Sequence, residues 1–186
     1  MDHIEIEFKI LLDKTIYQKI LNDYQDKKID DYVQTNYYLF HPELDKRRYS
    51  LRIRYKKGKY ELTLKTPAQV GLNEFNENID EDIKNKIFNH QKVSNKIFDI
   101  LEKENIDYKE LQCGNYLTTH RVDIPLNNGL LSLDANEYNG HQDYELEFEV
   151  DDYEKGFKEF QNIIQLYNLE YKGNCLSKIR RMKNTL

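Results

Sequence analysis

Residues 142–150 read QDYELEFEV, and acidic side chains alternate with large apolar side chains along this stretch. A repeat of two residues is typical of a β-strand, in which successive side chains point to opposite faces of a sheet. One face of this strand would carry Glu145, Glu147 and Glu149, and the other would carry Leu146 and Phe148. We therefore predict a strand that has one apolar face and one densely charged face.

The same alternation predicts strands along most of the chain. Six further stretches have this pattern, at 3–11, 49–57, 59–66, 72–79, 115–124 and 129–137, and the β-branched and aromatic stretch 35–40 is a further predicted strand. Apolar residues three and four positions apart predict helices over 14–24 and 153–167, and two helical pieces within 80–104. Turn residues lie between neighbouring strands, as at Lys57-Gly58 and Asn139-Gly140. The last segment, 175–186, is basic.

In most of these strands the charged residues share one parity. Besides the glutamates of 142–150, this parity holds Glu5, Glu7, Lys9, Arg52, Arg54, Lys65, Arg121 and Asp134. Two arrangements satisfy the pattern: an open sheet with its charged face in water, or about eight antiparallel strands that close around a charged interior. Periodicity leaves both open. Charge chemistry favours closure, because neighbouring like charges on an exposed sheet only repel one another.

The charged faces combine the ligands of a metal ion with those of a phosphate chain. Glu5 and Glu7 lie on the same side of one strand, as do Glu145 and Glu147, and such oxygen donors suit Mg²⁺ or Mn²⁺. Arg52 and Arg54 point two guanidinium groups the same way, which suits phosphate oxygens. The chain has no glycine-rich phosphate loop and no catalytic triad pattern. Carboxylates beside fixed cations favour a polyphosphate ligand.

Composition limits the other classes of function. The chain has 186 residues, with 28 Lys and Arg against 33 Asp and Glu, so its net charge is −5. This balance argues against binding nucleic acid or an anionic membrane, where basic excess supplies affinity. No apolar run is long enough to cross a membrane, and the N-terminus does not read as a signal peptide. We expect a single domain over 1–186, a cytoplasmic location, and two cysteines that form no disulfide framework.

The order of these motifs resembles the CYTH family, the triphosphate tunnel metalloenzymes, and most closely its small single-domain bacterial members. Glu5-Ile6-Glu7-Phe8-Lys9 resembles the ExExK signature of the family at the start of the chain. Further matches follow in order along the chain: Asn36-Tyr37-Tyr38, Leu51-Arg52-Ile53-Arg54, Thr63-Leu64-Lys65-Thr66-Pro67, Glu74, Arg121, Asp134, Glu145-Leu146-Glu147, and Ser177-Lys178 with Arg181. Phe40-His41-Pro42 departs from the Asp-Thr pair that many members have nearby.

The resemblance implies an α+β fold, an eight-stranded closed antiparallel barrel with helices packed outside, and a divalent metal. It implies metal ligands at Glu5, Glu7, Asp134, Glu145 and Glu147. It implies substrate contacts at Lys9, Arg52, Arg54, Lys65, Glu74, Arg121, Lys178 and Arg181. Within these sets Glu5, Glu7, Lys9, Glu145 and Glu147 are the predicted catalytic residues.

The predicted activity is hydrolysis of a triphosphate, with Mg²⁺ or Mn²⁺ as cofactor. Inorganic tripolyphosphate is the substrate that we favour, and a nucleoside or thiamine triphosphate would need the same site. Two other hypotheses remain: a class-four adenylate cyclase that makes cyclic AMP from ATP, and a binding module without turnover. The expected partner is a small-molecule triphosphate, with no nucleic acid and no membrane, for a monomer or a homodimer.

Overall fold

The computed structural model describes residues 2–185. For Asp2, His3 and Gly114 it describes the backbone only. Its strands are β1 (Asp2–Leu12), β2 (Asp30–Phe40), β3 (Ser50–Lys56), β4 (Lys59–Pro67), β5 (Leu72–Ile79), β6 (Gln112–Leu126), β7 (Gly129–Tyr138) and β8 (His141–Val150). Its helices are α1 (Lys14–Asp23), α2 (Pro42–Arg47), α3 (Glu81–Phe88), α4 (Lys96–Lys103), α5 (Tyr153–Gln165) and α6 (Lys178–Lys183), with short 3₁₀ turns η1 (Gln25–Lys27) and η2 (Tyr108–Glu110).

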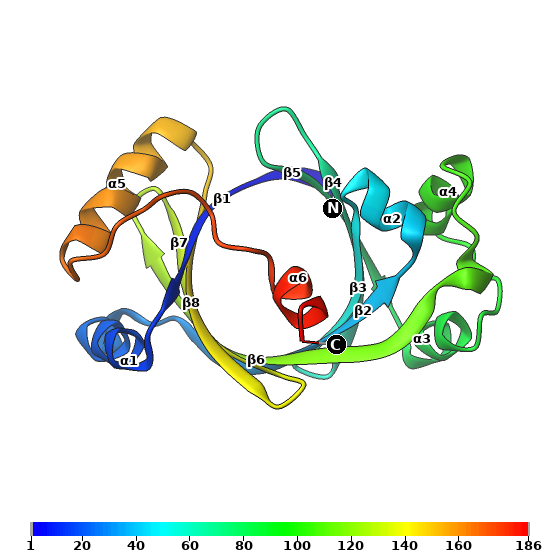
Figure 1. Cartoon of the computed structure of the whole chain (residues 1–186), viewed down its shortest axis with the longest axis horizontal. Coiled ribbons are helices and arrows are strands. Elements are labelled where there is room, and N and C mark those ends of the chain that lie inside the picture. The colour runs from blue at the N-terminus through cyan, green and yellow to red at the C-terminus, as the bar shows by residue number, and fades with distance from the viewer. Residues whose placement is uncertain (1, 186) are drawn as a thin grey trace. The chain divides into compact units, whose positions relative to one another are not determined.

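The eight strands form a closed antiparallel barrel in the order β1-β5-β4-β3-β2-β6-β7-β8. Helices α1 to α5 lie outside the sheet, which confirms the predicted α+β barrel, whereas α6 lies against the polar face, where its Lys178 and Arg181 pair with acids of β7 and β8 (Figure 1). Closure leaves no exposed sheet edge, and this resolves the choice that periodicity alone left open. The chain divides into two compact units, one of Gln34–Leu117 with the residues up to Ile4, the other of Glu5–Val33 with Thr118–Leu186. The first is called unit 1 and the second unit 2.

In unit 2 the apolar parity of the strands faces two helices. Phe8 pairs with Phe148, and Phe148 pairs with Leu131, so these side chains share one face of the sheet. Helices α1 and α5 flank this part of the sheet (Figure 1), and Phe160 of α5 packs in the same core. α5 approaches closely because Gly156 lies against Val150: a Cβ at Gly156 would be 2.5 Å from Val150 Cγ1.

In unit 1 the apolar parity of the strands likewise faces helices, and it forms a second apolar core with α3 and α4. The register pairs Leu51 with Leu64 and Leu64 with Phe75, and both leucines are completely buried. Ile97 and Leu101 of α4 join this core, and Figure 1 shows α3 and α4 on the same outer side of these strands. The polar parity of β3, β4 and β5 therefore lies on the opposite face of the sheet, away from these helices.

Side-chain caps fix where the helices begin. Asp13, Asp80, Asn95 and Asp152 each accept a hydrogen bond from a backbone N–H of the first turn, at α1, α3, α4 and α5. Such a cap contributes about 1 kcal/mol because it satisfies an N–H that has no helical partner. At α2 the cap is His41, whose Nδ1 accepts from Glu43 N at 3.1 Å, and Pro42 follows it. The His-Pro departure from the family pattern therefore starts a helix here.

The predicted elements match the structure except at the starts of two strands and at two short helices. β2 begins at Asp30 rather than at 35, and the region 80–104 contains two helices, as predicted. Neither α2 nor α6 was predicted from the sequence, because each has only six residues and too few turns to show an apolar repeat. No helix among residues 2–185 combines the length and apolar character that a membrane span requires.

Candidate functional site

The polar face of unit 2 gathers acidic and basic side chains from four strands. Cross-strand partners share a face of a sheet, and Lys9 pairs with Glu147 across β1 and β8. Glu145 pairs with Asp134 of β7, and Asp134 pairs with Arg121 of β6. Asp134 and Glu145 are completely buried. Five predicted site residues from distant parts of the sequence are thus brought onto one face.

Lys178 of α6 lies among three of these carboxylates. Its Nζ is 2.8 Å from Asp134 Oδ2, 2.6 Å from Glu147 Oε1 and 3.2 Å from Glu145 Oε2. The side chain of Lys178 is only 10% exposed. Charged groups are rarely buried to this degree without compensating partners, and here the acids and the ammonium compensate each other.

Two arginines complete the acidic cluster. Arg121 donates from Nε to Asp134 Oδ1 at 2.7 Å, and it also pairs with Glu147. Arg181 of α6 donates from Nε to Asp143 Oδ2 at 2.8 Å, and it also pairs with Glu145. Arg181 donates further to the backbone oxygen of Leu176. Arg181, which the resemblance assigns to the substrate, therefore holds α6 to β8 in this structure.

The first strand is tied to the segment before α6. Lys9 pairs with Glu7, and its backbone N–H donates to Asn174 Oδ1 at 2.8 Å. Asn174 Nδ2 donates in turn to the backbone oxygen of Glu7 at 2.9 Å. Cys175 N donates to the backbone oxygen of Lys9. These contacts hold the ExExK strand and the C-terminal segment together within unit 2.

The cluster shifts the pKa values of its two glutamates in opposite directions. Burial disfavours the charge on Glu147, but Lys178, Arg121 and Lys9 outweigh it and hold the pKa of Glu147 well below its usual range. Burial, helped by Glu147, raises the pKa of Glu145. Burial lowers the pKa of Lys178, but Asp134 and the two glutamates outweigh it and hold that pKa well above normal, so Lys178 is positively charged at neutral pH.

Unit 1 carries the other group of predicted residues, and here basic residues outnumber acids. Lys65 Nζ is 2.8 Å from Glu74 Oε2, and Asn76 donates to Glu74 Oε1. Arg54 donates from Nε to Asn36 Oδ1 at 3.1 Å. The register places Arg52 beside Thr63 on the same polar face. Burial would raise the pKa of Glu74, but Lys65 and Arg52 lower it to about 2.

The structure places all of the predicted site residues on polar strand faces or on α6. Glu5, at the start of unit 2, is buried with 8% exposure. Two buried or half-buried partners were missed: Asp143, which binds Arg181, and Tyr32, which donates to Asp123 at 3.0 Å. Asp123 shares the charged parity of Arg121 but was not predicted as a site residue. Asp143 has the parity of Glu145, so extending the charged parity of this strand by two residues would have found it.

The acids of unit 2 have the chemistry of a divalent-cation site. Carboxylate oxygens from Asp134, Glu145 and Glu147 converge on one point, and all-oxygen donor sets suit Mg²⁺ or Mn²⁺. In residues 2–185 no group of three acidic, His or Cys side chains is arranged directly around a metal position. The convergence point of these three acids is the ammonium of Lys178. The donors therefore fit a hard cation, and a cationic side chain lies among them.

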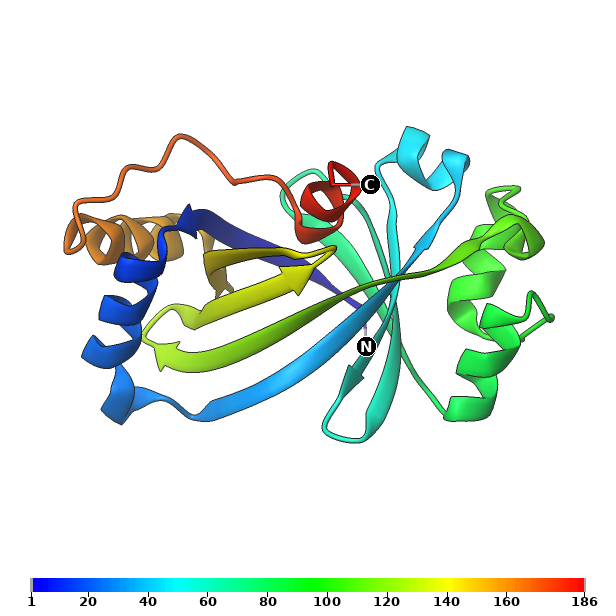
Figure 2. The same ribbon diagram turned by 60° about the horizontal axis from the view of Figure 1, so that its bottom comes forward.

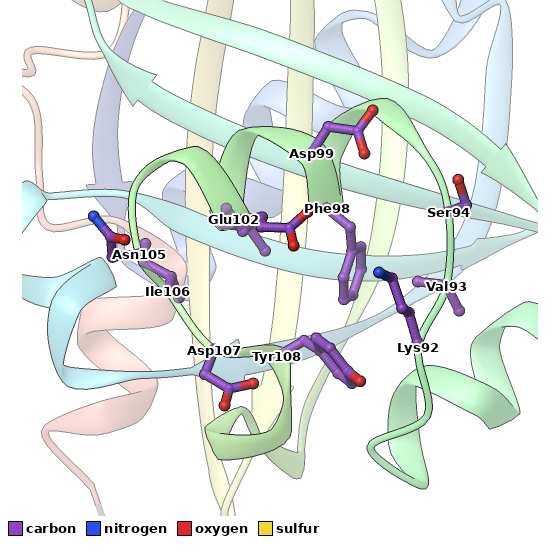
Figure 3. Close-up of a pocket in the computed structure, with 11 residues that line it drawn as sticks. Lys92, Val93, Ser94, Phe98, Asp99, Glu102, Asn105, Ile106, Asp107 and Tyr108 are labelled. Atoms are coloured by element: carbon purple, nitrogen blue, oxygen red, sulfur yellow. The ribbon is translucent and has the colours of Figure 1, made fainter.

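A separate cavity of about 470 Å³ lies outside these faces, in unit 1. Figure 3 shows Phe98 and Tyr108 on its walls, with Lys92, Glu102 and Asp107 around them. None of its lining residues is a predicted site residue. The cavity has no cluster of basic side chains, so it is a poor candidate for a phosphate chain.

The family model of the CYTH domain matches residues 3–182. The chain belongs to the CYTH family. The match spans both units, from the ExExK strand to α6, and it confirms the resemblance drawn from the motifs.

Similar proteins agree with this assignment. The chain is 34% identical over 168 residues to YjbK of Bacillus subtilis (strain 168), which is named as a candidate triphosphatase, and the match covers 89% of this chain and 87% of YjbK. A crystal structure of a candidate adenylate cyclase from Bacillus halodurans superposes with a TM-score of 0.89 at 30% identity, covering 97% of each chain. HpAC1 from Hippeastrum has the same fold, with a TM-score of 0.81 at 20% identity over 97% of this chain and 96% of that chain.

Proposed function

We propose that this CYTH protein hydrolyses a triphosphate, most readily inorganic tripolyphosphate, with a divalent cation. The observation that carries the proposal is the convergence of Asp134, Glu145 and Glu147 within one buried, cation-rich face. Its relative YjbK is named as a candidate triphosphatase, which supports a phosphoric anhydride as the substrate. We also propose that residues 1–186 act as one CYTH domain.

We assign the cation, Mg²⁺ or Mn²⁺, to oxygens of Asp134, Glu145 and Glu147, with Glu5 and Glu7 of the ExExK strand as further ligands. When bound, such a cation neutralises charge on phosphate oxygens and makes water a stronger nucleophile. Glu147 is well suited to hold a cation because its carboxyl stays ionised at neutral pH. Besides holding the cation, a carboxylate of this set would accept the proton of the attacking water.

The basic side chains have the task of orienting the phosphate chain. We assign this task to Lys9, Arg121 and Lys178 in unit 2, and to Arg52, Arg54 and Lys65 in unit 1. Their neighbours already fix several of them, as Asn36 fixes Arg54 and Glu74 fixes Lys65. Preorganised cations lower the barrier because they need no rearrangement when charge develops on the leaving phosphate.

A second candidate activity is cyclisation of ATP to cyclic AMP and diphosphate. It is favoured by the similarity to the Bacillus halodurans protein, which is described as a candidate adenylate cyclase and matches over 97% of both chains. The same carboxylates and cations would serve it, with the ribose 3′-hydroxyl attacking the α-phosphorus in place of water. Hydrolysis and cyclisation therefore differ in how the nucleotide is oriented.

A substrate panel tests the proposal. The full chain is incubated with tripolyphosphate, ATP, GTP or thiamine triphosphate, in the presence of Mg²⁺, Mn²⁺ or a chelator. Both orthophosphate and cyclic nucleotide are measured. We expect orthophosphate release from tripolyphosphate with either metal and none with the chelator. Cyclic AMP as the main product from ATP would instead support the cyclase, and binding without any product would support a non-catalytic module.

A further inference from the structure

The ammonium of Lys178 occupies the point where the proposed metal ligands converge. It lies within 3.2 Å of oxygens from Asp134, Glu145 and Glu147, and the side chain is 10% exposed. A divalent cation bound by the same oxygens would be at a few ångströms from this ammonium, where two positive charges repel strongly in a buried site. Lys178 and a metal ion therefore compete for the same ligands.

The charge balance of the cluster shows what Lys178 does without a metal. Arg121 pairs with Asp134 and Glu147, and Arg181 pairs with Glu145 and Asp143. These two guanidinium groups face four carboxylates. The ammonium of Lys178 contacts three of the four, whereas Lys9, the other nearby cation, pairs with Glu7, so Lys178 supplies positive charge that the two guanidinium groups alone do not.

The attachment of α6 allows Lys178 to be exchanged. A helix of six residues has little stability of its own, so α6 depends on its contacts with the sheet. Apart from Lys178 these contacts include Arg181 with Asp143, and Asn139 Nδ2, which donates to Met182 O at 3.4 Å. Figure 2 shows α6 at the end of the extended segment that follows α5. Arg181 and Asn139 can keep α6 attached while the side chain of Lys178 moves.

We propose that Lys178 is an exchangeable counter-ion, which neutralises the acidic cluster in the metal-free protein and moves to the phosphate chain when a divalent cation binds. The inference rests on the proposed function, in that the three acids hold the metal. Its consequence is a coupling between two ligands. A metal ion that binds alone has to displace Lys178 from the acids. When a triphosphate is also bound, Lys178 pairs with the phosphate chain instead, so each ligand strengthens the binding of the other.

Mg²⁺ binding to the full chain tests this exchange by titration calorimetry. Lys178→Met removes the charge but keeps most of the volume of the side chain. We expect this variant to bind Mg²⁺ about tenfold more tightly than the wild type, because no ammonium has to leave. The matched control is Arg180→Met, because Arg180 is exposed on the same helix and makes no ion pair within residues 2–185. This control should bind Mg²⁺ like the wild type.

The second measurement uses imidotriphosphate, a triphosphate analogue that resists hydrolysis. It should tighten Mg²⁺ binding to the wild type, and the tightening should be about tenfold smaller in Lys178→Met, after correction for the Mg²⁺ that the analogue binds in solution. Hydrogen exchange on the wild type gives a readout that needs no variant. Mg²⁺ should speed the exchange of the backbone amides of 178–183 severalfold, because one of the contacts of α6 is lost.

Equal Mg²⁺ affinity in Lys178→Met and the wild type would overturn the inference, as would unchanged or slower exchange in 178–183. If the wild type still hydrolysed tripolyphosphate with Mg²⁺ in that case, the proposed function would stand and the exchange alone would fail. Absence of Mg²⁺ binding in every variant, both alone and with imidotriphosphate, would overturn both. If Lys178→Met did not fold, the hydrogen-exchange result on the wild type would decide.

Discussion

Glu74→Gln should make the protein less stable by an amount that depends on pH. Glu74 is 8% exposed, and its carboxylate lies 2.8 Å from Lys65 Nζ. Lys65 and Arg52 lower its pKa from 4.5 to about 2 against the effect of burial. That drop corresponds to on the order of 3 kcal/mol of folding free energy at neutral pH. Because the folded pKa is lowered, this stabilisation is complete above pH 4.5 and is lost as pH falls towards 2.

The assay is urea denaturation of the wild type and of Glu74→Gln between pH 7 and pH 3. The difference in unfolding free energy should be about 3 kcal/mol at pH 7 and should shrink to about 1 kcal/mol at pH 3. Glu77→Gln is the matched control, because Glu77 lies on the opposite face of the same strand, three residues further along. It should give a small difference at every pH. A difference for Glu74→Gln that stays constant from pH 7 to pH 3 would refute the electrostatic reasoning.

Three further substitutions test packing, capping and phosphate binding. Gly156→Ala places a methyl group 2.5 Å from Val150 Cγ1, so it should lower the unfolding free energy by about 1–3 kcal/mol, and an unchanged melting temperature would contradict the packing. Asn95→Ala removes the cap that accepts from Phe98 N at 2.9 Å and should cost about 1 kcal/mol in urea denaturation, whereas no loss would show that α4 needs no cap. Arg54→Gln should raise the KM for tripolyphosphate by about tenfold with little change in stability, and an unaltered KM would remove Arg54 from the substrate site.

The strand faces could be predicted from the sequence because a register slip of one residue would move every side chain to the wrong side. Arg52 and Thr63 lie on one face and Leu51 and Leu64 on the other, as their parity requires. The same alternation could not predict closure, since an open sheet satisfies it equally well. The closed order, with β1 between β5 and β8, depends on pairings between strands that are far apart in the sequence.

The position of α6 is the main feature of the candidate site that the sequence did not show. Its basic residues were matched to a family element, but six residues are too few to indicate a helix or a buried side. What places α6 is the pairing of Arg181 with Asp143, two residues separated by 38 positions. No local pattern reports such a contact, and so the ammonium of Lys178 among the acids emerged only from the structure.

Metal-dependent turnover in a single-residue variant tests the central claim most directly. Orthophosphate release from tripolyphosphate with Mg²⁺ is compared for the wild type, Glu147→Gln and the control Glu137→Gln, in which an exposed glutamate of β7 is changed. We predict that Glu147→Gln lowers kcat by about a hundredfold or more while the circular dichroism spectrum is unchanged, and that Glu137→Gln matches the wild type. A folded Glu147→Gln variant with the wild-type kcat would contradict the account.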